Sequence, residues 1–177
     1  MVGRLPADAR SAPAKTESVR LGVVFERRRI DHPWQQWRWQ PIAVIPGAAP
    51  VGEPKLLRTA EGSAWYHIAS LDLELFSGET HDYRLNLSQD PPLVYVLWRF
   101  VSDDPQSPPD PFHVTACHSE TQDYLDGSDV MAEGVPMPEP VRQLVEDYVR
   151  AYHVDQPFKK RKRTPLAPPR DAGDEYG

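Results

Sequence analysis

Hydrophobic and polar residues alternate along much of the chain with the two-residue period of β-strands. The first alternation begins at residue 19 and sets one apolar face against a mixed one: Val19, Leu21, Val23 and Phe25 against Arg20, Gly22, Val24 and Glu26. Residues 37–45 (WRWQPIAVI) and 64–76 (AWYHIASLDLELF) predict two further strands. Pro41 indicates an edge or a bulge in the second strand, because proline has no N–H for the ladder.

The remaining strands are predicted from turn residues and from one long apolar run. A loop is expected over residues 48–62, before the strand at 64–76. Ser77-Gly78 then favours a hairpin that leads into a strand at about 80–88. Residues 93–101 (LVYVLWRFV) are almost continuously apolar, which predicts a central strand covered on both faces. Short strands are expected at residues 112–117 and 129–135, with a surface loop at 102–111.

Two helices are predicted in the last third of the chain. Ser119 and Gln122 have capping-box spacing and predict a short helix with Tyr124 and Leu125 facing inward. The stronger signal follows Pro138-Glu139-Pro140, where apolar residues recur at helical spacing over about 14 positions. These residues are Val141, Leu144, Val145, Tyr148, Val149 and Tyr152.

The order of these elements predicts a mainly β (α+β) fold. About six to seven antiparallel strands would form a bent sheet or a partly open barrel, with the C-terminal amphipathic helix over its open side. Residues 1–17 are expected to be a disordered arm, residues 18–157 a single β-rich domain and residues 158–177 a basic flexible tail.

Charge is distributed unevenly along the 177 residues, although the net charge is only −6. Residues 1–59 carry ten Lys/Arg and five acids, residues 60–156 carry four and eighteen, and residues 157–177 carry six and three. The acidic middle of the chain, residues 60–156, would repel nucleic acid and anionic lipid. We therefore expect a protein partner and no binding to nucleic acid. The sequence has no long apolar run and no secretory leader, so membrane insertion is not expected.

The sequence carries no signature of a common enzyme class, and the protein is expected to be non-catalytic. The phosphate-loop, dinucleotide-binding, HExxH and GxSxG motifs are absent. The single cysteine, Cys117, excludes an internal disulfide and favours the cytoplasm. Strand alternation separates His113, Cys117 and His118 too widely for one metal ion, so we expect a buried cysteine with surface histidines and no cofactor.

Three tryptophans fall within six residues directly after three arginines, which is the most unusual pattern in the chain. Tryptophan and arginine are the residues most often found at binding hot spots. The alternative is that Trp37 and Trp39 belong to the core, whereas Trp34 is harder to bury. The residues expected to contact a partner here are Arg27, Arg28, Arg29, Trp34, Trp37 and Arg38.

The tail contains a second candidate contact, a run of five basic residues preceded by an aromatic one. The run is either simply solvated or attracts an acidic partner surface or a phosphate, with the aromatic residue as an anchor. Its residues are Phe158, Lys159, Lys160, Arg161, Lys162 and Arg163.

Four stretches, spread over about residues 18–163, resemble an uncharacterised proteobacterial family known as a domain of unknown function. They read VRLGVVFERRRIDHPWQQWRWQPIAVIPGA, ETHDYRLNLSQDPPLVYVLWRF, HVTACHSETQDYLDG and VPMPEPVRQLVEDYVRAYHVDQPFKKRKR. Genes of that family often lie beside those of molybdenum-dependent formate dehydrogenases. The resemblance therefore implies an accessory or small-subunit role, with an oxidoreductase subunit as one candidate partner.

Three hypotheses follow. The first is a non-catalytic accessory protein or small subunit associated with a molybdenum-dependent formate dehydrogenase, which acts by protein–protein binding. The second is a general peptide- or protein-binding regulatory module with the tryptophan segment as its groove. The third is a binder of a pterin-type cofactor in the mouth of the barrel. The sequence leaves the oligomeric state open.

Overall fold

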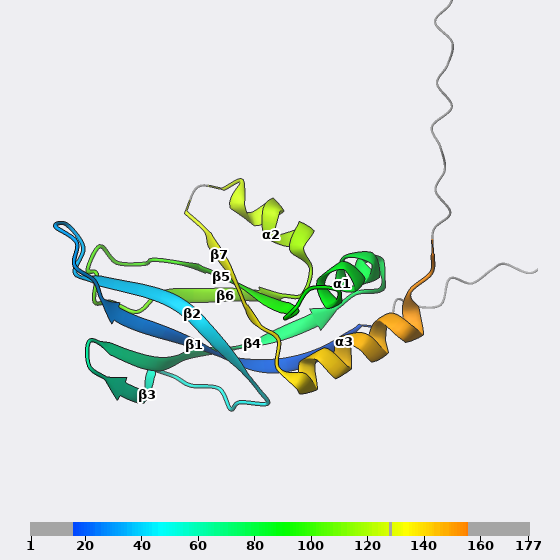
Figure 1. Ribbon diagram of the computed structural model, residues 1–177, viewed down its shortest axis with the longest axis horizontal. Coiled ribbons are helices and arrows are strands. Elements are labelled where there is room, and N and C mark those ends of the chain that lie inside the picture. The colour runs from blue at the N-terminus through cyan, green and yellow to red at the C-terminus, as the bar shows by residue number, and fades with distance from the viewer. Residues whose placement is uncertain (1–15, 128, 156–177) are drawn as a thin grey trace, which may run out of the picture.

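Strands form where the hydrophobic alternation is strongest, and they build two antiparallel sheets (Figure 1). The computed structural model describes residues 16–127 and 129–155. The larger sheet has the strand order β2-β1-β4-β3 and the smaller one the order β6-β5-β7. The seven strands are β1 (Glu17–Arg29), β2 (Trp37–Pro46), β3 (Lys55–Ala60), β4 (Ser63–Leu75), β5 (Leu93–Arg99), β6 (Asp110–Thr115) and β7 (Met131–Pro136).

The hydrophobic core lies between the two sheets. Phe25 of β1 meets Trp98 of β5 edge to face, with ring centroids 5.4 Å apart. β6 passes close to β4, and β7 passes close to β2, but the two sheets share no ladder. The predicted mainly β fold with a C-terminal helix is therefore confirmed, and the described strands do not close into a barrel.

β5 is the central strand of the smaller sheet and is covered on both faces, as its apolar run predicts. Val94, Val96 and Trp98 belong to the core between the sheets. On the other face, α2 (His118–Leu125) lies over the sheet, and the Tyr95 and His118 rings are 5.3 Å apart. Leu97 is fully buried on this second face.

The C-terminal amphipathic helix is confirmed as α3 (Glu139–Tyr152), which packs beside α1 (Thr80–Leu87) at one end of the sheets (Figure 1). Val141, Val145 and Tyr148 are its buried residues. Tyr83 of α1 meets Tyr148 with ring centroids 6.3 Å apart. Together the two helices cover the end of the core between the sheets.

The prediction of a strand at residues 80–88 was wrong, because this segment is α1, entered through the short 3-10 helix η1 (Ser77–Glu79). Its buried residues, Thr80, Tyr83 and Asn86, recur every three positions, which is helical spacing. Two of them are polar, so hydrophobic periodicity does not reveal the helix. Leu85 is exposed, so the helix has little apolar surface by which its sequence could be recognised.

The predicted loop over residues 48–62 contains a strand that the sequence analysis missed. β3 is the edge of the larger sheet, and all six of its residues are exposed. An edge strand with no buried face lacks the alternation by which strands are recognised. It is held by its antiparallel ladder to β4, which pairs Leu56 with Tyr66 and Arg58 with Trp65.

The short helix predicted near residue 119 forms as α2, between β6 and β7, but its start differs from the prediction. α2 begins at His118, and the residue before it, Cys117, makes no side-chain cap. Ser119 is therefore inside the helix and not at its cap. Tyr124 and Leu125 are each 39% exposed, and Thr121 is the buried residue of α2. The Tyr124 ring nevertheless faces the sheet, because it contacts the rings of Phe112 and His113 on β6.

Pro41 marks a bulge, as its missing N–H predicts. Val24 pairs with Ala43 and the next residue, Phe25, pairs with Pro41, which leaves Ile42 as the extra residue of β2.

The residues predicted to lie opposite the apolar face of β1 are not all exposed, because Val24 and Glu26 are buried too. The outer face of the larger sheet is thus partly covered by the loop after β2, which packs on Gly22, and by Trp65 of β4, which is hydrogen-bonded to Glu26.

The division into an arm, a domain and a tail stays a prediction, because residues 1–15 and 156–177 lie outside the described part of the chain. None of the helices within residues 16–127 and 129–155 has the length and apolar character that a bilayer crossing requires.

Candidate partner-binding site

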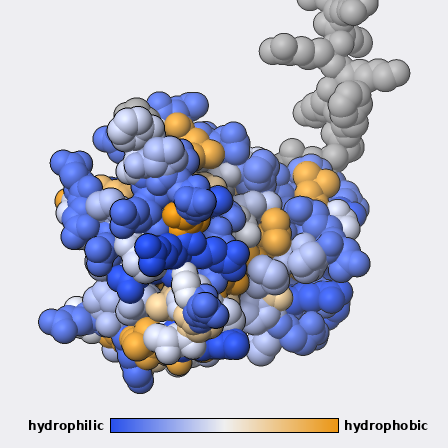
Figure 2. All heavy atoms as spheres, turned by 60° about the vertical axis from the view of Figure 1, so that its left-hand side comes forward, coloured by the Kyte–Doolittle hydropathy of each residue, from blue (hydrophilic) through white to orange (hydrophobic). Residues whose placement is uncertain are grey.

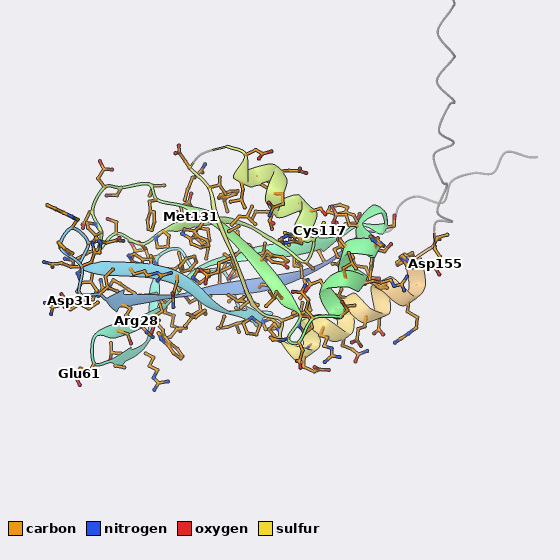
Figure 3. The ribbon with its side chains drawn as sticks, turned by 45° about the horizontal axis from the view of Figure 1, so that its top comes forward. Arg28, Asp31, Glu61, Cys117, Met131 and Asp155 are labelled. Atoms are coloured by element: carbon orange, nitrogen blue, oxygen red, sulfur yellow. The ribbon has the colours of Figure 1, made fainter. Side chains whose placement is uncertain are left out.

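The β1–β2 hairpin places four arginines and three tryptophans at one end of the molecule. We call residues 27–39 the arginine–tryptophan end. Its ladder pairs Arg27 with Trp39, Arg28 with Arg38 and Arg29 with Trp37. Figure 3 shows Arg28 and Asp31 at this end and Asp155 at the opposite end, beyond α3. The antiparallel register therefore gathers the residues that the sequence analysis selected.

On the inner face of the larger sheet, Arg27 lies among aromatic rings. Its guanidinium carbon is 4.8 Å from the ring centroid of Trp37, 5.5 Å from that of Tyr66 and 5.8 Å from that of Trp39. Trp39 is 6% exposed and belongs to the core, and Trp37 is half-buried. Cation–π contacts of this kind stabilise a guanidinium that is partly removed from water.

On the outer face, a buried carboxylate organises its neighbours. Glu26 is 5% exposed and accepts hydrogen bonds from Arg28 at 3.1 Å, Gln40 at 3.3 Å and Trp65 at 3.4 Å. Buried carboxylates are retained when donors surround them in this way. The ion pair to Glu26 also offsets the repulsion of Arg28 by Arg38, which lies directly opposite on β2.

A groove of about 430 Å³ runs between the tryptophans and the loop that follows β5. Trp34, Trp37 and Trp39 line one side, and Phe100 with residues 102–105 lines the other. The Trp39 indole donates to the carbonyl of Pro105 at 3.2 Å, which holds the two sides together. Trp34 is 88% exposed, so its ring stands at the rim of the groove in water.

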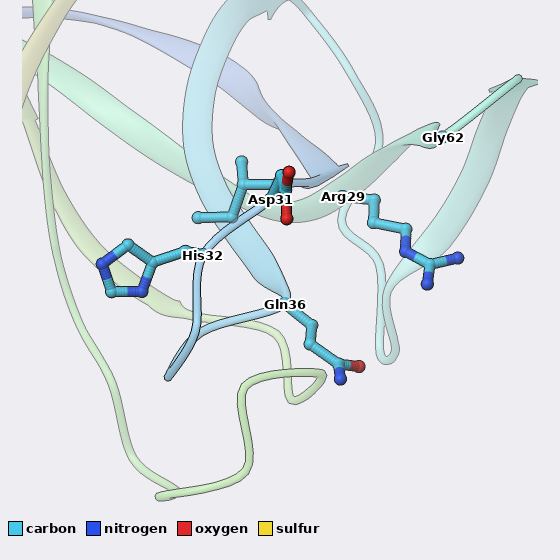
Figure 4. Close-up of a pocket in the computed structure, with 6 residues that line it drawn as sticks. Arg29, Asp31, His32, Gln36 and Gly62 are labelled. Carbon is cyan, nitrogen blue, oxygen red and sulfur yellow. The ribbon is translucent and has the colours of Figure 1, made fainter.

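A second hollow, of about 500 Å³, adjoins the groove at His32 (Figure 4). Arg29, Asp31 and Gln36 line it together with Gly62 of the β3–β4 turn. Figure 4 shows the Arg29 and His32 side chains pointing in different directions, so they do not converge on one point. Figure 2 turns this end forward and shows hydrophilic residues across its centre, with hydrophobic residues beside them.

The structure thus brings together Arg27, Arg28, Arg29, Trp34, Trp37 and Arg38, although it divides them between two faces of one hairpin. Arg29 and Arg38 make no ion pair with any residue of 16–127 or 129–155. The predicted tail contacts from Phe158 to Arg163 lie outside the described residues.

Several residues of this end were missed by the sequence analysis. Glu26, Trp65 and Tyr66 take part only because β4 pairs with β1, and Phe100 because the loop after β5 folds back. The adjacent aromatics Trp65 and Tyr66 were a usable signal, since they point to opposite faces of one strand. Their partners depend on register, which one strand's pattern does not specify.

A second polar cluster lies between the starts of α1 and α2, around Cys117 (Figure 3). Burial raises the pKa of the Cys117 thiol to about 12, and burial likewise raises the pKa of Glu79. Hydrogen bonds from Ser119 and from the thiol lower the pKa of Asp82. A thiol with so high a pKa is a poor nucleophile at neutral pH.

His113 and His118 do not join Cys117 in a metal site. His113 pairs with Glu120 at 2.9 Å, and His118 is exposed at the start of α2. In the part of the chain that the structure describes, no group of three or more His, Cys, Asp or Glu side chains has the geometry to hold a metal ion.

The opposite end of the molecule has a hollow of about 720 Å³ between α1 and the end of α3. His153 lies within hydrogen-bond distance of Thr80 at 3.1 Å, and Asp155 accepts from Arg84 at 2.9 Å. These polar groups satisfy one another, so this hollow presents mainly paired charges.

Comparison with known proteins gives a family and no relative of known function. No curated protein matches the chain, and no solved structure does. The model of a family described as "Protein of unknown function (DUF3305)" matches residues 20–162, which spans β1 to α3 and both faces of the arginine–tryptophan end. The chain therefore belongs to the DUF3305 family.

Proposed function

We propose that this chain is a non-catalytic accessory protein that binds another protein through the arginine–tryptophan end. One observation carries the proposal: Trp34, 88% exposed, lies in the turn of the hairpin whose strands carry Arg29 and Arg38, and these two arginines have no ion-pair partner among the described residues. Tryptophan and arginine dominate binding hot spots because they bury a large area and also form directed contacts. An exposed indole at the rim of a groove gives a partner such an area.

The partner in this proposal is a subunit of a molybdenum-dependent formate dehydrogenase, which is what the family resemblance implies. The basic tail from Lys159 to Arg163 would add long-range attraction to an acidic partner surface. The non-catalytic part is supported by the chemistry of the cluster at Cys117, whose thiol is held in its neutral form.

Co-purification tests the proposal. The tagged full-length chain is recovered from cells that express a molybdenum-dependent formate dehydrogenase, and the bound proteins are identified by mass spectrometry. The expected result is recovery of an oxidoreductase subunit, and its loss by at least about tenfold in the double variant Arg29→Ala/Trp34→Ala. A version without residues 157–177 separates the contribution of the tail.

The matched control is Leu85→Ala/Arg150→Ala, which removes an exposed apolar residue and an exposed arginine from α1 and α3. It should retain the partner as the unaltered chain does. Equal recovery with both double variants would place the contact elsewhere. Recovery of no oxidoreductase subunit under mild conditions would end the proposal.

The second hypothesis, a general peptide-binding regulatory module, is favoured by one observation, the groove walled by Trp34, Trp37 and Phe100. The same co-purification distinguishes it, because unrelated proteins that share a short segment would then be recovered. The third hypothesis requires a cavity between the sheets for a pterin. The side chains packed there, such as Phe25 against Trp98, lend it no support.

A further inference from the structure

The groove between the tryptophans and the loop after β5 carries negative charge on its loop side. Asp103 and Asp104 line it, and the described residues that line it include no lysine or arginine. The sequence has no lysine or arginine at any position from residue 100 to residue 141, so this wall has no basic neighbour along the chain. The lining of the groove is therefore negative, and a cation is attracted to it.

The loop that carries these carboxylates is fixed in place, but its charge is not neutralised. The Trp39 indole donates to the carbonyl of Pro105 and holds the loop against β2. Asp104 accepts the backbone N–H of Gln106 at 2.9 Å, which closes a turn. Neither Asp103 nor Asp104 has an ion-pair partner among residues 16–127 and 129–155. The two carboxylates are thus positioned to receive a positive charge that the described part of the chain does not supply.

The opposite wall of the groove suits a cation as well. It is made of indole rings, whose electron-rich faces attract cations more strongly than other aromatic side chains do. Trp37 and Trp39 already show this property, because the guanidinium carbon of Arg27 lies 4.8 and 5.8 Å from their ring centroids. Trp34 has no such contact within the described part of the chain, and its ring is 88% exposed.

The arginines near the groove limit how much positive charge it accepts. Arg27 does not line the groove, and its Nε is buried, so it repels a bound cation only from beyond the rings. Arg29 lines the neighbouring hollow instead. The two carboxylates of the lining face a bound cation directly and outweigh the single charge of Arg27. This balance favours one positive charge in the groove and disfavours a run of several.

Exposed apolar residues stand on both rims of the groove. Phe100 lines the loop side and is exposed, as is its neighbour Val101, while Trp34 stands on the other side. Covering these side chains removes apolar surface from water, which stabilises a complex. The groove volume of about 430 Å³ is within the range of ordinary ligand pockets. An occupant with apolar residues on either side of its cation would cover both rims.

We propose that the groove binds one lysine or arginine side chain of an extended partner segment that has apolar residues on either side of it. The charged group lies between the indole rings and the carboxylates of Asp103 and Asp104, and the apolar neighbours cover Trp34 and Phe100. The inference rests on the proposed function and names the chemistry of the partner segment that the arginine–tryptophan end recognises.

The test compares two blocked peptides, acetyl-Ser-Leu-Lys-Leu-Ser-amide and the same peptide with norleucine in place of lysine. Norleucine keeps the four side-chain carbons and removes the ammonium group, so the difference in affinity reports the charge. Both are titrated into the ¹⁵N-labelled full-length chain, and the indole N–H signals of its five tryptophans are followed by NMR. The lysine peptide should shift the Trp34 and Trp37 signals and bind at least about fivefold more tightly than the norleucine peptide.

The double variant Asp103→Asn/Asp104→Asn tests the carboxylates. Both residues are exposed, and asparagine at position 104 keeps an oxygen for the Gln106 N–H, so the loop should retain its turn. The variant should bind the lysine peptide at least about threefold more weakly and the norleucine peptide as before. The matched control is Asp123→Asn/Asp126→Asn, which removes two exposed carboxylates at α2 and should leave both affinities unchanged.

Two further measurements separate the partner segment from other occupants. A version without residues 157–177 should bind the lysine peptide as the full-length chain does. A clear rise in affinity would show that the basic tail competes for the groove and would overturn the partner segment as its occupant. n-Butylammonium chloride should bind more weakly than the lysine peptide, because it lacks the apolar flanks. Equal binding would mean that the groove takes a free cation, which also overturns the inference.

Equal affinity for the lysine and norleucine peptides, or no shift with either, would overturn the cation site. An undiminished preference for lysine in Asp103→Asn/Asp104→Asn would do the same. These outcomes leave the co-purification result untouched, so a failure of this inference is distinct from a failure of the proposed function.

Discussion

The thiol of Cys117 donates a hydrogen bond to the carboxylate of Asp82 at 3.1 Å and so ties the start of α2 to α1. Cys117 is buried, and burial raises its pKa from an ordinary value of 9.0 to about 12. The sulfur therefore works as a structural donor, and the two helices are joined by a contact that depends on its proton.

The first prediction concerns the reactivity of this thiol. In the native protein at pH 8, alkylation of Cys117 by iodoacetamide should be at least about a thousandfold slower than in urea, because a three-unit rise in pKa removes that much thiolate. Since the chain has a single cysteine, mass spectrometry of the modified protein reports this site alone. Equal rates in the native and unfolded protein would contradict both the burial and the raised pKa.

The second prediction concerns stability at alkaline pH. Because the folded protein raises the pKa of Cys117, its contribution to stability is complete below about pH 9 and is lost as the pH rises toward about 12. Burial raises the pKa of Tyr83 as well, which adds a loss that begins near pH 10. Urea unfolding at a series of pH values should show a decline that is shallower in Cys117→Ala. The same slope in both proteins would mean that folding does not raise the pKa of Cys117.

The third prediction concerns Asn86, which is 1% exposed. Its amide donates to the carbonyls of Leu93 and Ala116 at 2.7 and 2.8 Å and accepts the N–H of Leu93 at 2.8 Å. These bonds join α1 to the start of β5 and to the residue that follows β6. Asn86→Ala should lower the free energy of unfolding by about 2–4 kcal/mol, since three buried partners lose their bonds.

Asn86→Asp is the informative companion to this variant. It keeps the oxygen that accepts the Leu93 N–H but replaces the NH₂ group, which donates to two carbonyls, with a second oxygen. The variant protein should therefore lose a comparable free energy of unfolding at neutral pH. Chemical denaturation measures the free energy of unfolding of both Asn86 variants. A loss below about 0.5 kcal/mol in Asn86→Ala would show that water replaces the side chain.

The fourth prediction concerns Gly22 in the middle of β1. A Cβ there would come within 2.7 Å of the Ala48 Cβ and 2.8 Å of the His67 Nε2, so the loop after β2 packs on this strand only because the side chain is missing. Gly22→Ala should cost about 1–3 kcal/mol through overpacking. Gly52→Ala is the control, because its Cβ would meet nothing within 4 Å. Unchanged thermal stability in Gly22→Ala would mean that the loop moves aside freely.

The elements that the sequence predicts correctly are those in which burial leaves a periodic record. α3 is recognised because its buried residues are apolar and recur at helical spacing, and β5 because it is apolar and buried almost throughout. α1 escapes because Thr80 and Asn86 are polar and are buried through hydrogen bonds, which hydrophobic periodicity does not register. β3 escapes because all six of its residues are exposed, so it has no alternation of buried and exposed positions.

The arginine–tryptophan end could be selected from its residue types, but the arrangement of its side chains could not be predicted. Trp and Arg in one short segment predicted a contact surface, and the structure places Trp34 in water and Trp39 in the core. Which tryptophan is buried depends on the loop after β5, which supplies the carbonyl of Pro105 for the Trp39 indole from 66 residues away. Contacts at that separation are set by the packing of the two sheets.

The side chains of the turn between β1 and β2 lie outside the core. All six residues from 31 to 36 are exposed, so replacing their side chains removes little from the core. Folding therefore exerts almost no selection on what stands at these positions. A contact with a surface beyond the described residues is therefore free to select the residue at position 34, and a change in that surface can be answered here without rebuilding the rest of the molecule.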